Sequence, residues 1–180
     1  KKITIPNFLR IENLIVKIFN YVYYLFTFEE KIVDFNNFFY PLDFIYNWNN
    51  LYKPTGFLQY QLIVNSEEAL EKIIYTISKS NIKPYLSILK LHKEGNNNFL
   101  SFPIKGFSLA LDFKLQAGLY DLLDKIDNIV IKNNGRIYLA KDNRIDKDKF
   151  EKMYSKVNEF KKIRKELGAN KKYISLQSIR

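Results

Sequence analysis

The chain has 180 residues, of which 47% are hydrophobic, so it is long enough for one domain with a sizeable core and too apolar to be disordered throughout. It contains no cysteine and a single histidine, His92, which excludes disulfide bonds, thiolate nucleophiles and metal sites built from cysteine or several histidines. The net charge of +10 is compatible with binding to nucleic acid or to an anionic membrane surface. Because Lys, Asn, Ile, Phe and Tyr, all encoded by AT-rich codons, are abundant together, composition alone accounts for much of this charge.

Residues 1–55 are predicted to be an N-terminal extension of strands and connections. The segment Val22–Phe26 is β-branched and aromatic, which favours a strand, whereas Phe8–Phe19 fits either a strand or a helix. Charged residues interrupt the most apolar stretch, and only 11 uncharged residues run from Ile18 to Phe28, fewer than the ~18 that a spanning helix needs. We therefore expect no transmembrane helix, and the first residues show no signal-peptide pattern.

Residues 56–145 are predicted to form a core with the order βαββαβ. The expected elements are a strand over Leu58–Val64, a helix from Ser66 to about Asn81, strands over Tyr85–Leu91 and Phe107–Phe113, a helix over Gly118–Asn133, and a short strand over Arg136–Lys141. In the first helix, an apolar face is predicted for Leu70, Ile73, Ile74 and Ile77, Ser66 is the expected N-cap, and Asn81 is the expected left-handed stop. This order is that of a ferredoxin-like α+β unit, an antiparallel sheet with both helices on one face. The other face is then available to a ligand or a neighbouring domain.

Residues 146–180 are predicted to be a basic helix and tail. Asp146 is a suitable N-cap for a helix over Lys147–Leu167, and Gly168 is suited to end it. Thirteen basic residues against six acidic ones place +7 of the net charge in residues 141–180.

Four polar side chains in this core are candidates for chemistry. Gln59 and Gln61 lie two apart in a strand, so both amides point to one face, where they can bind hydroxyl groups or simply meet solvent. Lys90 shares strand parity with apolar residues and must reach either a partner or water. Lys141, at the end of the last predicted strand, can stabilise a developing negative charge or pair with Asp142 at the surface.

An RNA-binding module is the alternative reading of a basic βαββαβ chain. Residues 105–112 begin like the RNA-recognition consensus, which places aromatic side chains on the open face of the sheet. Leu109 and Asp112 stand at two of the aromatic positions, so only Phe107 is available to stack on a base. The match is therefore poor at the aromatic positions that would stack on RNA bases.

Four short sequence motifs follow one another in an order that is typical of one enzyme family. They are Phe39-Tyr40-Pro41-Leu42-Asp43, Gly56-Phe57-Leu58-Gln59-Tyr60-Gln61, Leu100-Ser101-Phe102-Pro103 and Tyr138-Leu139-Ala140-Lys141-Asp142. With them, residues 38–164 resemble the C-terminal, substrate-binding half of FAD-linked oxidases of the vanillyl-alcohol-oxidase superfamily. Within it, the resemblance is to the branch of decaprenylphosphoryl-β-D-ribose 2′-oxidase and D-arabinono-1,4-lactone oxidase.

The resemblance implies an FAD-dependent oxidoreductase that oxidises a secondary alcohol of a sugar by hydride transfer to flavin. The FAD-binding domain would lie upstream of Lys1 in the same polypeptide, so this chain would be half of an active site. By matching motif positions, Lys141 is the implied catalytic residue and Tyr138 the residue against the flavin, while Gln59, Gln61 and Lys90 are the implied substrate-binding residues.

Two departures from the family pattern bear on the substrate. Ser108 and Ala110 stand where mycobacterial members have asparagine and cysteine, and His92 replaces an aromatic residue two positions after the pocket lysine. The implied substrate is a sugar or a polyprenyl-phosphate sugar. We expect a cytoplasmic protein or one held peripherally at the cell membrane, with the basic C-terminal segment meeting anionic headgroups.

Overall fold

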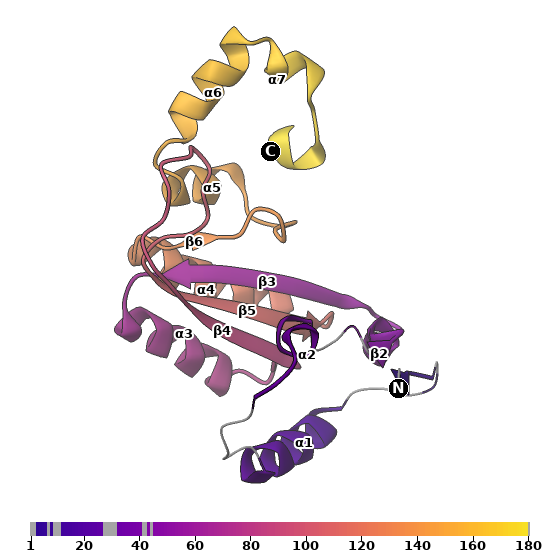
Figure 1. Cartoon of the computed structure of the whole chain (residues 1–180). Helices are drawn as coiled ribbons and strands as arrows, with labels where there is room; N and C mark the ends of the chain where they lie inside the picture. The colour runs from indigo at the N-terminus through magenta and orange to yellow at the C-terminus, as the bar shows by residue number, and fades with distance from the viewer. Residues whose placement is uncertain are drawn as a thin grey trace. The chain divides into compact units, whose positions relative to one another are not determined.

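The computed structural model of the chain describes residues 3–6, 8, 12–26, 32–40, 43 and 45–179 (Figure 1). Two residues of the first family motif, Pro41 and Leu42, lie outside this set. The chain divides into two compact units, one comprising Lys1–Phe57 with Lys114–Gln116 and the other Leu58–Phe113 with Ala117–Arg180.

The first unit contains a small parallel sheet and a cluster of aromatic rings. Strand β1 (Ile3–Thr4) pairs with β2 (Ile45–Tyr46), and the buried side-chain amide of Asn50 donates a 3.1 Å hydrogen bond to the carbonyl oxygen of Ile5. The 3₁₀ helix η1 (Trp48–Tyr52) contributes two aromatic residues that pack with Phe57, the ring centroids being 4.6 to 6.0 Å apart.

The strand predicted for Val22–Phe26 is wrong, because this segment is the end of helix α1 (Asn13–Phe26). Apolar residues recur there at helical spacing, and Phe19 stacks on Tyr23 one turn later, with ring centroids 5.9 Å apart. The β preference of aromatic and β-branched residues reflects packing in a sheet, so it does not hold where no sheet is offered. A shorter helix, α2 (Phe35–Phe39), follows. Within the described ranges, no helix has the length and apolar character needed to cross a membrane.

The second unit is built on a four-stranded sheet with the order β4-β5-β3-β6. Its elements are β3 (Phe57–Val64), which begins at the boundary between the units, α3 (Glu67–Lys79), β4 (Leu86–His92), β5 (Gly106–Lys114), α4 (Leu119–Lys132) and β6 (Arg136–Ile137). β4 pairs antiparallel with β5, and β3 pairs antiparallel with β6. The predicted α+β class and βαββαβ order are confirmed.

The core lies between this sheet and helices α3 and α4, which cover one of its faces (Figure 1). The apolar residues of one parity in β3 and β5 are buried there, together with one side of each helix: Leu58, Tyr60, Leu62, Leu109, Leu111, Phe113, Leu70, Ile73, Ile77, Leu122, Leu123, Ile126 and Val130. Each fully buried aliphatic or phenyl side chain contributes about 1.5–3 kcal/mol. The residues of opposite parity therefore lie on the other face of the sheet.

The register of β4 and β5 fixes which residues share that second face. Lys90 lies opposite Ser108, and His92 lies opposite Gly106 at the start of β5. Gly106 has φ +143°, and a Cβ atom there would stand 2.1 Å from the carbonyl oxygen of Val64. Glycine is therefore required where β5 passes β3.

The ends of α3 agree with the prediction in part. The hydroxyl of Ser66 accepts a hydrogen bond from the Ala69 amide at 3.2 Å, as predicted for an N-cap. Ile74 is 48% exposed, however, because Ala69 rather than Ile74 completes the buried face. Asn81 does not adopt the left-handed conformation; the last carbonyl groups instead accept from Lys83, whose Nζ lies 3.0 Å from the Ile77 oxygen.

The single C-terminal helix predicted over Lys147–Leu167 is broken in two. Asp146 caps α5 (Lys147–Met153) as predicted, but the chain leaves the helix at Tyr154 and re-enters one at α6 (Val157–Glu166). The break buries the ring of Tyr154 and lets its hydroxyl donate a 2.6 Å hydrogen bond to the carbonyl oxygen of Ile137. Gly168 ends α6 with φ +64°, as predicted, and α7 (Ala169–Lys172) and the 3₁₀ helix η2 (Leu176–Ile179) follow.

Candidate functional site

The face of the sheet that the helices leave free carries a cavity of about 440 Å³ in the second unit. This volume is within the range of sites for small ligands. Its lining residues are Gln61, Lys90, His92, Leu100, Phe102, Pro103, Tyr138, Leu139, Lys141 and Tyr154. They come from β3, β4, the loop before β5, the turn after β6 and the break between α5 and α6, so distant parts of the sequence meet here.

Four of the five site residues expected from the sequence line this cavity. Gln61 and Tyr138 are adjacent because the amide of Tyr138 donates a 2.9 Å hydrogen bond to the carbonyl oxygen of Gln61, which extends the pairing of β3 with β6. Lys90 enters from β4, and Lys141 from the turn that follows β6. Gln59 is not among the lining residues. The roles assigned to all five remain predictions.

Lys141 does not end a strand, as the sequence predicted, but lies in a turn. β6 stops at Ile137, and the amide of Lys141 donates a 3.0 Å hydrogen bond to the carbonyl oxygen of Tyr138. The carboxylate of Asp142 accepts hydrogen bonds from the amides of Arg144 and Ile145, each at 3.0 Å. Because a side chain that bonds its own backbone two residues on stabilises a turn, Asp142 draws the chain out of the extended conformation.

A buried carboxylate, Asp112, accepts a hydrogen bond from Gln59 and lies within the electrostatic influence of Lys141. Asp112 is 3% exposed and points to the same side of β5 as Ser108, toward the cavity face. Burial raises its pKa, while a hydrogen bond from the Gln59 side chain and the positive charge of Lys141 act in the opposite direction. Gln59 therefore meets a carboxylate beside the cavity, and Lys141 acts on that same carboxylate. The sequence offered Asp112 only as a mismatch to an RNA-binding consensus.

His92, which the sequence indicated only as a departure from the family pattern, is a second contributor. It is the last residue of β4, and its Nε2 lies 2.8 Å from the hydroxyl oxygen of Ser108, which is 1% exposed. Its ring stands edge-on to Phe102, with the centroids 6.4 Å apart. The signal was present in the sequence, since His92 shares strand parity with Lys90 and must lie on the same face.

The cavity is electropositive and has aromatic walls. The described residues that line it include two lysines, Lys90 and Lys141, and no acidic residue, and the buried Asp112 lies beside it. Tyr138 packs against Phe102 with the ring centroids 4.8 Å apart. Such a site favours a ligand that combines hydroxyl groups or a phosphate with a flat or apolar part.

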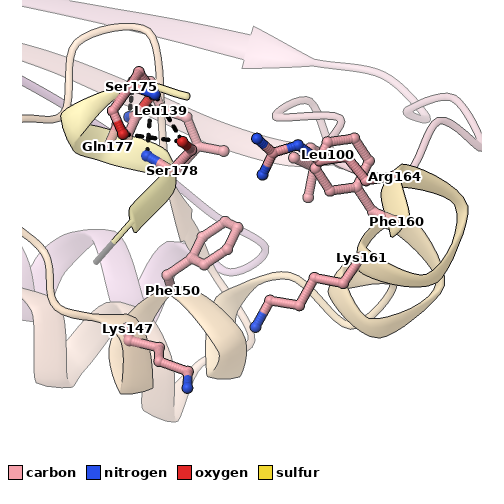
Figure 2. Close-up of a pocket in the computed structure, with 10 residues that line it drawn as sticks. All are labelled: Leu100, Leu139, Lys147, Phe150, Phe160, Lys161, Arg164, Ser175, Gln177 and Ser178. Atoms are coloured by element: carbon pink, nitrogen blue, oxygen red, sulfur yellow. Dashed lines mark hydrogen bonds between the residues drawn. The ribbon is translucent and has the colours of Figure 1, made fainter. Parts of the chain in front are cut away.

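A second cavity, of about 220 Å³, lies among the C-terminal helices (Figure 2). Figure 2 shows Phe150 of α5 and Lys161 of α6 extending toward the space between the labelled residues. Lys161 already pairs with Glu151, and Arg164 donates to the carbonyl oxygen of Tyr173. Since these cations are engaged within the chain, the first cavity is the better candidate site.

The fold disfavours the RNA-binding alternative. Phe107 has the strand parity of Leu109, Leu111 and Phe113, whose side chains face the helices rather than the open face. An aromatic at this position cannot form the stacking platform that such modules use. The described part of the chain also contains no group of three His, Cys, Asp or Glu side chains that could hold a metal ion.

Comparison with known proteins supports the family resemblance seen in the short motifs. Over 141 residues, which are 77% of the chain, the sequence is 38% identical to decaprenylphosphoryl-beta-D-ribose oxidase of Mycolicibacterium smegmatis. Over 99 residues, 54% of the chain, it is 30% identical to an uncharacterized protein encoded in the mprA 5′ region of Streptomyces coelicolor. No family model matches the sequence.

The first match confirms the predicted resemblance to an oxidase of the decaprenylphosphoryl-ribose oxidase type. The matched segments amount to 31% of the first relative and 27% of the second, so the chain spans less than a third of the length of either. The first relative is named as an oxidase, so this chain is similar to part of an oxidoreductase.

Proposed function

We propose that this chain is the substrate-binding part of an FAD-dependent oxidoreductase that oxidises a secondary alcohol of a sugar. The observation that carries the proposal is the meeting of Gln61, Lys90, Tyr138 and Lys141 around one cavity on the free face of the sheet. These residues are far apart in the sequence, and the family resemblance predicted each of them as a site residue. The similarity to an oxidase of decaprenylphosphoryl-beta-D-ribose supports the same activity.

The cavity suits the ring of FAD better than its pyrophosphate. Tyr138 and Phe102 offer aromatic surface and Lys141 a cation, which are the groups that accommodate a flat ring able to carry negative charge. The sequence has only six glycines and no glycine-rich phosphate-binding loop. We therefore propose that Tyr138 and Lys141 border the flavin ring, while an upstream domain of the same polypeptide holds the rest of FAD.

The substrate that fits the proposal is a ribose carried on a polyprenyl phosphate, or an aldonolactone. Gln61 presents an amide that can donate to and accept from sugar hydroxyls, and the His92–Ser108 pair offers a further polar edge. In this proposal Lys90, which lines the cavity from the edge strand β4, pairs with the phosphate. A lipid-linked substrate would require peripheral contact with a membrane, for which the basic residues 141–180 are suited.

In this mechanism the chain orients the sugar and stabilises charge. When bound, FAD would accept the hydride of the carbinol carbon, and the hydroxyl proton would leave to solvent, so that the carbinol becomes a ketone. Gln61 and Lys90 hold the sugar so that the reacting carbon has a fixed position, which removes an entropic part of the barrier. The ammonium of Lys141 would stabilise the negative charge that develops on the flavin as it accepts the hydride. Gln59, bonded to Asp112, keeps the neighbouring strand surface in place.

The proposal is tested with the full-length protein that contains this chain. We expect it to purify with FAD and, without oxygen, to lose the visible absorbance of oxidised flavin when a short-chain polyprenylphosphoryl ribose is added. An aldonolactone is the second substrate arm and distinguishes the two sugar classes. A protein that binds no FAD, or whose FAD is reduced by neither compound, would contradict the proposed function.

A further inference from the structure

A carboxylate that is fully buried lies on the opposite side of the sheet from the cavity. Asp127, on the inner face of α4, has no exposed surface. Three side chains donate to it: the hydroxyl of Tyr60 at 2.8 Å, the guanidinium of Arg144 at 2.6 and 2.7 Å, and the ammonium of Lys149 at 3.0 Å. All its partners lie far from it in the sequence, so this one carboxylate joins three segments to α4.

Two of those segments carry residues of the candidate site. Tyr60 lies between Gln59 and Gln61 in β3, and strand alternation turns it toward α4 while its two neighbours face the other side. Arg144 lies three residues after Lys141, in the turn that Asp142 closes by accepting from the Arg144 amide. Asp127 is therefore connected through its partners to both the glutamine strand and the lysine turn.

The contact between Asp127 and Arg144 has the geometry of a specific clamp. Nη2 of Arg144 reaches both carboxylate oxygens, and Nη1 donates to Asp124 at 2.6 Å. The guanidinium is only 12% exposed and stands over the ring of Tyr60, 5.8 Å from its centroid. Burial acts to lower the pKa of Arg144, but its hydrogen bonds and ion pair with Asp127 raise it overall. A planar fork held at several points cannot be replaced by a lysine.

Stability alone does not account for a buried network of this kind. Ion pairs removed from water lose hydration free energy that their attraction often only offsets, and apolar residues of similar size are frequently as stable. What such a network provides is a fixed arrangement of the segments that it joins. Here two of those segments carry residues that line the cavity, Gln61 and Lys141.

We propose that Asp127 and Arg144 are positioning residues that hold the Lys141 turn and the Gln59–Gln61 strand in their arrangement around the cavity. They act from the far side of the sheet and do not touch the substrate. The inference deepens the proposed function and depends on it only for its catalytic consequence. The fixing of the turn is a property of the fold and can be measured without substrate.

The first test measures hydrogen–deuterium exchange in the full-length protein. Arg144→Lys keeps the charge but removes the fork, and we expect faster exchange in peptides that cover residues 138–145, with α3 unchanged. Arg164→Lys is the matched control, because Arg164 donates to Tyr173 outside the network, and it should leave that turn unchanged. Should Arg144→Lys fail to fold, Lys149→Gln removes one donor from a partly exposed position and should loosen the same turn less. Unchanged hydrogen–deuterium exchange in residues 138–145, or equally faster exchange throughout the protein, would overturn the proposal.

The second test asks whether the clamp acts through Lys141. At saturating substrate we expect Arg144→Lys to slow reduction of the flavin by roughly ten- to a hundredfold, the order expected when a reacting group is misplaced by about 1 Å. In a Lys141→Met background the same change should cost less than about twofold, because its target is already gone. Equal losses in both backgrounds would refute positioning through Lys141. If Lys141→Met alone has no effect, the proposed function fails instead, and the exchange measurement still decides whether the clamp fixes the turn.

Discussion

Replacement of Lys141 by methionine removes one of the two lysine charges of the cavity and keeps most of the side-chain volume. Loss of one preorganised donor to a developing charge typically costs about 2.7–4 kcal/mol, or a hundred- to a thousandfold in rate. Lys141 is half-buried rather than buried, and Lys90 remains in the same cavity, so we expect the lower end of this range. A unit charge about 4 Å away at an effective dielectric of ~20 gives a similar figure, about 4 kcal/mol before solvent screening.

The assay is rapid mixing of the full-length enzyme with saturating substrate in the absence of oxygen. This condition follows only the first half-reaction, so changes in substrate affinity or in flavin reoxidation do not enter. Lys105→Met is the matched control, because Lys105 is 78% exposed and pairs only loosely with Glu94 at 3.7 Å. Its rate should stay within about twofold of wild type.

Two results would refute the reasoning about Lys141. Flavin reduction in Lys141→Met within about threefold of wild type would show that its charge does not stabilise the transition state. An equal loss in Lys105→Met would show that the cost comes from the general positive field of the chain rather than from a placed ammonium.

Three further predictions concern stability, pH and nucleic acid. Ser66→Ala should destabilise the fold by about 1 kcal/mol in urea unfolding through loss of the N-cap of α3, whereas Ser78→Ala, an exposed hydroxyl on the same helix, should not. Burial raises the pKa of Asp112 above its unfolded value of 3.8, so the stability that this group contributes is full below pH 3.8 and is lost as the pH rises through the folded pKa. Asp112→Asn should abolish this loss in thermal unfolding measured across the acid range. A variant with the same dependence of stability on pH as the wild type would contradict the assignment. RNA binding should be weak and lost between about 50 and 200 mM salt, and selective binding that survives the higher salt and requires Phe107 would favour an RNA-binding module instead.

Periodicity predicted the elements of the second unit because each has one face in the core. The strand over Leu58–Val64 and the helix over Gly118–Asn133 were found within a residue or two, since burial of alternate or every third to fourth residue leaves a direct pattern. The same reasoning failed for Val22–Phe26, where β preference was given more weight than the helical spacing of the apolar residues. It failed again at Tyr154, whose departure from the helix depends on a contact with Ile137 that no local pattern records.

Part of the candidate site could also be predicted from the sequence, through strand periodicity and motifs. Strand parity assigned Gln59 and Gln61 to one face, and the family motifs indicated Lys90, Tyr138 and Lys141. The contact of Gln59 with Asp112 and the pairing of Asp127 with Arg144 were not accessible. Such pairs join residues far apart in the sequence, and whether a carboxylate is buried with a partner is decided only when the helices settle on the sheet.

Gly106, the first residue of β5, limits how closely β5 can approach β3, and so bears on the width of the cavity. Because the carbonyl of Val64 would meet any Cβ at position 106, even alanine there must move the backbone of β5 away from β3. Gln61 is on β3, while Lys90 follows β5 through its pairing with Ser108, so the two side chains would separate together with their strands. Position 106 is thus a place where a single methyl group would alter the width of the cavity without changing any side chain that lines it.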